Sequence, residues 1–99
     1  MKEKLKILII DDHPMIIDGY QKAILSQHQF SPKIHTATNC DEAMEQLSDS
    51  KSEEAFDYVL IDLQLPASSD LKYTSGEDIA VFVRKHFRDV KIIILTMID

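Results

Sequence analysis

Three stretches of the chain are almost continuously apolar, and a weaker fourth lies between the first two. The strong stretches run over 4–10, 56–61 and 91–95, and the weaker one over 33–37. Strands buried on both faces of a parallel sheet have this pattern, because helices cover both sides and few positions meet water. We therefore predict four strands at these positions.

The segments between these stretches repeat their apolar residues with the period of a helix. The first helix is expected to start around Pro14, whose missing N–H costs nothing in a first turn, with Asp12 just before it. The stripe of this helix fades near Ser26. The predicted buried stripes are Ile16, Ile17, Tyr20, Ala23 and Ile24 in the first helix, Cys40, Ala43, Met44 and Leu47 in the second, and Ile79, Ala80, Val83 and Phe87 in the third.

The second and third helices have recognisable starts. Asn39 with Glu42 three residues later resembles a capping box. Glu77 and Asp78 follow Gly76 and suit the positive end of a helix. The polar stretches 48–54 and 67–75 are predicted to be loops. The resulting order, βαβαβαβ, indicates an α/β fold with right-handed crossovers and helices on both faces of a doubly wound parallel sheet.

Composition narrows the possible functions. The chain has 99 residues, 44% of them hydrophobic and 28% charged, which predicts one ordinary globular domain. The net charge of −6, with no basic run, argues against direct nucleic-acid binding. No apolar stretch reaches membrane-spanning length, and no signal peptide is evident. Cys40 is the only cysteine and is expected to be a buried, inert thiol, which favours a cytoplasmic location.

Carboxylates end two of the apolar stretches. Asp11 and Asp12 follow the stretch 4–10, and Asp62 follows the stretch 56–61. The carboxyl ends of parallel strands share one edge of the sheet, so these side chains are expected to converge. Three carboxylates in one crevice repel each other unless a cation lies between them, and Mg²⁺ prefers such oxygen ligands. The pattern predicts a metal site containing a carboxylate that can accept a phosphoryl group.

Three segments together resemble the receiver domain of two-component response regulators. They are the segment ending in Asp11-Asp12-His13-Pro14, the segment Asp62-Leu63-Gln64-Leu65-Pro66 after its apolar run, and the final run ending in Thr96. Their order and spacing agree with the family throughout the chain. The resemblance implies a flavodoxin-like sheet with strand order 2-1-3-4.

The resemblance also implies a role for each matched residue. Asp62 would accept a phosphoryl group from a sensor histidine kinase or a phosphotransfer protein. Asp11 and Asp12, with Asp62 and the backbone carbonyl of Gln64, would hold Mg²⁺. Thr96 would hydrogen-bond a phosphoryl oxygen and report the modification. The chain would then be a regulatory phosphoacceptor in a phosphorelay, not an enzyme, and would control an output domain outside this chain, expected to be transcriptional.

Measured against the family, the receiver domain spanning 1–99 is expected to be truncated after the fourth strand. It would lack the fourth helix, the fifth strand with the family's Lys, and the fifth helix. The sheet would therefore be incomplete, with its fourth strand at an open edge. A long apolar edge strand favours pairing, so we expect a homo-oligomer through this edge.

Three alternatives remain open from the sequence. One is a receiver fragment that no longer takes phosphate and acts through protein–protein contacts or self-association, as absence of the family's Lys would suggest. Another is a phosphohydrolase with Asp62 as nucleophile, although Gln64 stands where such enzymes usually carry a second acid. The third is a nucleotide- or flavin-binding domain, which the lack of a Gly-rich turn after the first strand disfavours. His13 is interpreted as a loop residue without a chemical role.

Overall fold

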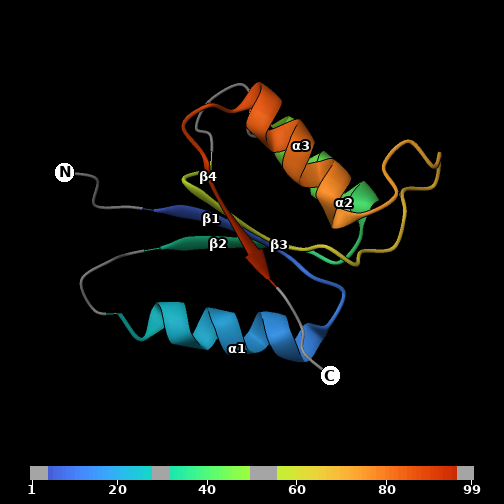
Figure 1. The fold of residues 1–99 in the computed structure, drawn as a ribbon. Coiled ribbons are helices and arrows are strands. Elements are labelled where there is room, and N and C mark those ends of the chain that lie inside the picture. Colours follow the sequence, from blue (N-terminus) through green and yellow to red (C-terminus); the bar gives the residue numbers. More distant parts are fainter. Residues whose placement is uncertain (1–4, 28–31, 50–55, 96–99) are drawn as a thin grey trace.

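The computed structural model describes residues 5–27, 32–49 and 56–95, which form a three-layer α/β structure. Four parallel strands in the order β2-β1-β3-β4 make the central sheet, with α1 on one face and α2 and α3 on the other (Figure 1). The predicted fold class and strand order are confirmed. The elements are β1 (Lys6–Ile10), α1 (Pro14–Leu25), β2 (Lys33–Ala37), α2 (Cys40–Asp49), β3 (Tyr58–Asp62), α3 (Gly76–His86) and β4 (Lys91–Leu95).

Most predicted boundaries agree with these elements to within one or two residues. The expectation that 48–54 forms a loop is wrong at its start, because Ser48 and Asp49 belong to the last turn of α2. The other residues of that stretch lie outside the described part of the chain. The loop over 67–75 is present as predicted. None of the helices in the described segments is long and apolar enough to cross a bilayer.

The core has two unequal halves, one on each face of the sheet. The larger cluster lies under α2 and α3 and includes the predicted helix positions Cys40, Ala43, Leu47, Ile79 and Val83. The smaller cluster lies under α1 and contains Ile7, Ile9, Ile17, Leu60 and Leu95. Residues that alternate along β1 therefore face opposite layers, as expected for a strand covered on both sides.

The predicted stripe of α1 is only partly correct. Ile17 is buried and Ile24 packs against the smaller cluster, but Tyr20 and Ala23 are exposed. The reason lies in the layer itself: α1 is the single helix that the described residues place on this face (Figure 1). A lone helix buries a narrow stripe against the sheet, whereas neighbouring helices also bury its flanks.

The capping box predicted at α2 is present in part: Asn39 caps the helix, but the Glu42 side chain binds the residue before Asn39. The Asn39 side chain accepts a hydrogen bond from the N–H of Glu42 at 2.8 Å, as an N-cap should. The Glu42 carboxylate, however, reaches one residue further back, to the N–H of Thr38 at 2.7 Å and its hydroxyl at 2.8 Å. Asp78 holds Thr74 in the same way ahead of α3. The starts of α2 and α3, at the carboxyl edge of the sheet, are thus fixed by local hydrogen bonds.

Candidate functional site

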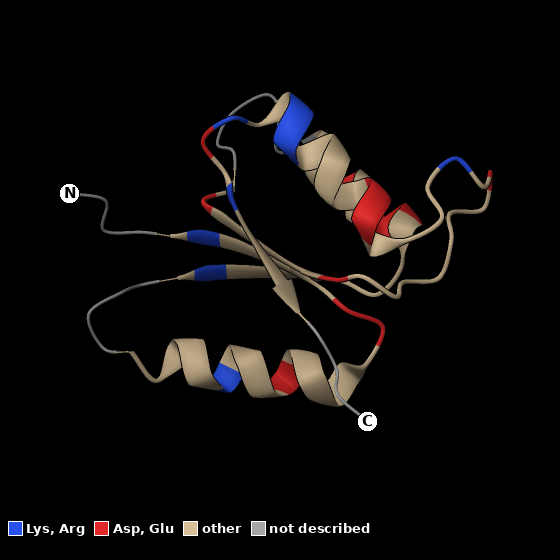
Figure 2. Ribbon diagram, in the orientation of Figure 1, with Lys and Arg blue, Asp and Glu red and all other residues tan. Residues whose placement is uncertain are grey.

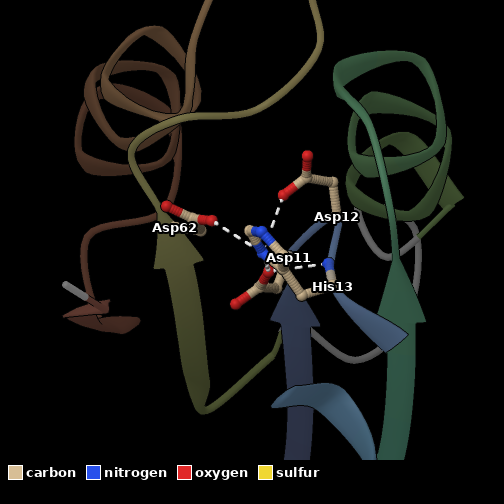
Figure 3. A group of neighbouring side chains, drawn as sticks. All are labelled: Asp11, Asp12, His13 and Asp62. Atoms are coloured by element: carbon tan, nitrogen blue, oxygen red, sulfur yellow. Dashed lines mark hydrogen bonds and ion pairs between the residues drawn. The ribbon is translucent and has the colours of Figure 1, made fainter. Parts of the chain in front are cut away.

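The sheet register places the acidic residues side by side. Ile10 pairs with Ile61 between β1 and β3, so the next residue along each strand, Asp11 and Asp62, stands at the same edge. Asp12 follows in the turn into α1. Figure 2 shows these acidic positions together at one edge, and Figure 3 shows the side chains pointing toward one another. The convergence expected from strand topology is therefore present, with one ligand atom from each residue within 4.8 Å of the others.

In each buried carboxylate of the cluster, one oxygen accepts a backbone hydrogen bond and the other accepts no hydrogen bond from the described residues. Asp11 is fully buried and Asp62 is 4% exposed. Oδ1 of Asp62 accepts the backbone N–H of Gln64 at 3.0 Å, and Oδ1 of Asp11 accepts the backbone N–H of His13 at 2.9 Å. Among the described residues, Oδ2 of Asp11 and Oδ2 of Asp62 accept no hydrogen bond. Buried carboxylate oxygens are rarely left this way, so the cluster is suited to a further electrophile or cation.

His13 lies inside the cluster, although no role was expected for it. Its Nδ1 is 2.7 Å from Oδ1 of Asp11, 3.0 Å from Oδ1 of Asp12 and 3.6 Å from Oδ2 of Asp62. The hydrogen bond to Asp11, and then the charges of the surrounding carboxylates, raise the pKa of His13. The imidazole thus lies where positive charge offsets carboxylate repulsion. In the sequence, its position directly after an acidic pair was the signal that could have placed His13 in the cluster.

The donor set fits a hard divalent cation. The three carboxylates supply oxygen atoms, which Mg²⁺ prefers over nitrogen or sulfur. Oδ2 of Asp11 and Oδ2 of Asp62 are buried and accept no hydrogen bond among the described residues, and one ligand atom of each residue in the cluster lies within 4.8 Å of the others. The backbone of Gln64 is next to this group, since its N–H binds Asp62; its carbonyl as a metal ligand stays a prediction. Thr96 lies outside the described residues, so its predicted role stays a prediction as well.

Gly76 allows α3 to start directly against the end of β3. Its N–H donates to the carbonyl of Leu63 at 2.9 Å. A Cβ at this position would overlap the carbonyl oxygen of Asp62 and would lie 2.8 Å from Cα of Leu63. Only glycine fits such a close backbone approach without displacing the strand end. Gly76 therefore positions the backbone that carries Asp62, a role that the sequence showed only as a helix start.

Cys40 lies at the start of α2, and its Sγ is 3.8 Å from the carbonyl oxygen of Ser75, just before α3. It is fully buried, and burial raises the pKa of its thiol. A thiol with a raised pKa is a poor nucleophile. The expectation of an inert, buried cysteine is consistent with these surroundings.

The family model for the response regulator receiver domain matches residues 7–99. The chain belongs to this family. The match covers both acidic segments of the site and, apart from Lys6, all four strands, so it agrees with the resemblance seen in the sequence. A search of the curated proteins found no match.

Solved structures of response regulators share the fold. RcsB from Salmonella typhimurium superimposes with a TM-score of 0.72 at 22% identity, covering 98% of this chain and 44% of its own. MaeR bound to beryllium trifluoride gives a TM-score of 0.72 at 22% identity, covering 96% of this chain and 69% of its own. The present chain therefore spans less than half of RcsB. At this level of identity the likeness shows the fold alone.

Proposed function

We propose that this chain is a phosphorelay receiver that accepts a phosphoryl group on Asp62 from a phosphohistidine donor. The observation that supports it most directly is the state of the Asp62 carboxylate. The N–H of Gln64 donates a hydrogen bond to Oδ1. Oδ2 is buried, accepts no hydrogen bond from the described residues and points into the acidic cluster. A carboxylate fixed by one oxygen presents the other in a defined direction, which favours in-line attack on phosphorus.

The transfer exchanges one bond for another at phosphorus. Oδ2 of Asp62 forms an acyl–phosphate bond as the nitrogen–phosphorus bond of the donor breaks, and the released imidazole takes up a proton. The product carries about −1.5 to −2 charge in place of one carboxylate charge. Asp11 and Asp12 each have a ligand atom within 4.8 Å of one from Asp62, so the added charge makes the site more crowded with negative charge. Positive charge at this place is therefore needed for the reaction.

Mg²⁺ is the cation that the proposal assigns to the site. When bound, it supplies the positive charge that stabilises the transferring oxygens. Asp11, Asp12 and Asp62, with the carbonyl of Gln64, would hold it. Thr96 would donate a hydrogen bond to the phosphoryl group and signal its presence. We infer that the chain works in the cytoplasm with a sensor histidine kinase or phosphotransfer protein and controls a transcriptional output domain.

Intact-mass spectrometry with a small phosphodonor tests this proposal. The protein is incubated with phosphoramidate or acetyl phosphate, with and without Mg²⁺. A single phosphoryl adduct that forms only with Mg²⁺ and disappears in Asp62→Asn is the expected result. Asp18→Asn is the matched control, because Asp18 lies on the exposed side of α1 in an ion pair with Lys22. An unmodified wild-type protein, or an adduct that persists in Asp62→Asn, contradicts the proposal.

The edge of the sheet supports a second candidate function, self-association. Ile93 and Ile94 of β4 are 44% and 43% exposed, which is unusual for residues of a parallel sheet. Beside them a groove of about 470 Å³ is lined by residues that include Leu63, Ala80 and Val81. An open apolar strand edge favours pairing with a second copy. On this proposal the chain acts through association, with or without phosphate.

Light scattering across a range of concentrations tests the association. Ile93→Lys puts a charge on the exposed edge and is expected to yield monomers where the wild type forms dimers or larger species. Val81→Lys, on the neighbouring helix surface, shows whether the groove takes part. A wild-type chain that stays monomeric at high concentration contradicts this second function and leaves the phosphoacceptor proposal unaffected.

A further inference from the structure

The imidazole of His13 lies among the carboxylates at distances typical of ligands that share one metal ion. Its Nδ1 is 3.0 Å from Oδ1 of Asp12 and 3.6 Å from Oδ2 of Asp62. Metal–ligand bonds of about 2.0–2.2 Å place neighbouring ligand atoms about 3.0–3.5 Å apart. The contact with Oδ1 of Asp11, at 2.7 Å, is shorter and is a hydrogen bond. His13 is therefore close enough to join the carboxylates in one coordination shell.

Two buried oxygen atoms of the same group lack a hydrogen-bond donor. Oδ2 of Asp11 and Oδ2 of Asp62 accept no hydrogen bond from the described residues, and these side chains are only 1% and 6% exposed. Buried carboxylate oxygens normally have a partner. Figure 3 shows the four side chains converging, with the ring of His13 between the carboxylates. The cluster thus offers a nitrogen atom together with oxygen atoms that still need a partner.

The backbone of His13 is fixed, while its side chain has no structural task in the helix. Its N–H donates to Oδ1 of Asp11 at 2.9 Å, and its carbonyl accepts the N–H groups of Ile16 and Ile17 in α1. It occupies the N-cap position of α1, but its side chain makes no capping hydrogen bond. The side chain is 44% exposed and that of Asp12 is 33% exposed, so a cation can enter from solvent at this side.

A nitrogen ligand changes which cations the cluster favours. Mg²⁺ prefers oxygen ligands, demands octahedral geometry and keeps several of its waters. Imidazole is a good ligand for Zn²⁺, which carboxylates bind as well. The histidine and the three aspartates supply four protein ligands, the number that Zn²⁺ takes in closed tetrahedral sites. The cluster with His13 is therefore better suited to Zn²⁺ than three carboxylates alone would be.

We propose that Zn²⁺ binds this cluster with Nδ1 of His13 as a ligand, and that the closed site blocks phosphoryl acceptance at Asp62. The blocking rests on the proposed phosphoacceptor function, whereas the binding does not. Four protein ligands leave Zn²⁺ no open position for a phosphoryl oxygen, and they engage the carboxylate of Asp62 itself. Mg²⁺ held by oxygen ligands alone keeps exchangeable waters, which a phosphoryl oxygen can replace. His13 thus makes the receptive state of the site sensitive to free Zn²⁺.

Calorimetric titration with Zn²⁺ and with Mg²⁺ tests the binding, in a mildly alkaline buffer where neutral imidazole can bind a metal. His13→Asn is expected to weaken Zn²⁺ binding about tenfold or more and to leave Mg²⁺ binding no weaker than in wild type. Co²⁺ serves as a visible probe, and the absorption of its four-coordinate form should be lost in His13→Asn. His86→Asn is the matched control, because His86 is an exposed histidine at the end of α3. Unchanged Zn²⁺ affinity, or equal losses for both ions, overturns the inference.

Phosphoramidate labelling, read by intact mass, tests the blocking. With Mg²⁺ present throughout, added Zn²⁺ is expected to lower the labelled fraction of wild type in proportion to Zn²⁺ occupancy, and a zinc-selective chelator should restore it. At the same Zn²⁺ concentration, His13→Asn should be labelled as fully as without Zn²⁺. Full labelling of wild type that is saturated with Zn²⁺ overturns the blocking. Failure of Mg²⁺ alone to support labelling would instead refute the phosphoacceptor function, and the titrations would still judge the role of His13.

Discussion

Strand β3 has a carboxylate at each end, and the two ends differ in how that carboxylate is satisfied. Asp57 precedes the strand, and its Oδ2 accepts the backbone N–H of Lys6 at 2.8 Å. Its own N–H and carbonyl bind the backbones of Lys6 and Lys91, so it joins three strands. Asp62 ends the strand with a buried oxygen that accepts no hydrogen bond among the described residues.

The difference distinguishes a carboxylate that stabilises a strand start from one that we propose to be the phosphoacceptor. At the amino edge of the sheet, hydrogen bonds compensate Asp57 and stabilise the strand start. At the carboxyl edge, Asp11, Asp12 and Asp62 are crowded around His13 (Figure 3), and this crowding disfavours folding unless a cation is present. Substitutions at the two ends should therefore have opposite effects on stability and on metal binding.

The largest effect is expected from the dependence of stability on Mg²⁺. Since the ion binds only the folded cluster, a concentration of about a hundred times its Kd should stabilise wild type by about 2.7 kcal/mol. Asp11→Asn and Asp62→Asn should lose most of this gain, because each removes a ligand. Urea unfolding with and without Mg²⁺ measures it. A gain of equal size in Asp11→Asn would place the metal elsewhere.

Substitutions at the two glycines are expected to act in opposite directions. Gly76→Ala should cost about 1–3 kcal/mol because its Cβ would overlap the end of β3, and it should weaken Mg²⁺ binding by moving Asp62. Gly19→Ala should stabilise by about 0.5–1 kcal/mol, since no atom lies within 4 Å of the added Cβ in an exposed helix. Urea midpoints and Mg²⁺ titration separate the two; unchanged Mg²⁺ affinity in Gly76→Ala would contradict the positioning role.

At the amino edge of the sheet we expect a smaller loss of stability, and one that does not depend on Mg²⁺. Asp57→Ala removes the acceptor of the Lys6 N–H and should cost about 1–2 kcal/mol of unfolding free energy. The Mg²⁺-dependent gain should remain that of wild type, because Asp57 is at the far end of the strand. Urea unfolding with and without Mg²⁺ measures both the loss of stability and the Mg²⁺-dependent gain. If Asp57→Ala abolished the metal effect, the contrast between the two ends would be wrong.

The smallest effect is expected in the helix caps near the site. Hydrogen bonds from the Thr38 backbone and hydroxyl lower the pKa of Glu42 below its ordinary value of 4.5. The stabilising contribution of this charged cap is therefore complete above that value and is lost as pH falls through the lower folded value. Glu42→Gln should shift stability slightly at neutral pH and remove this part of the acid dependence. Thermal unfolding between neutral and acidic pH, compared with wild type, measures the difference.

Local sequence determined most of the fold. Continuous apolar runs specify strands covered on both faces, and helical stripes between them specify crossovers, so the parallel sheet follows from patterning and chain connectivity. The buried faces of α2 and α3 were predictable for the same reason. The stripe of α1 was not, since Tyr20 is exposed where one helix alone covers the sheet.

The acidic site shows the same division between local and tertiary information. The sequence by itself determined that Asp11, Asp12 and Asp62 stand at the carboxyl ends of strands, because strand ends are local features. Only the tertiary structure decided which carboxylate oxygens accept no hydrogen bond among the described residues. It also decided that His13 lies between the carboxylates and that Gly76 fits against the strand end. It also decided the left-handed conformation of Leu71. These properties depend on atoms far apart in the chain, and no local pattern encodes the distances between them.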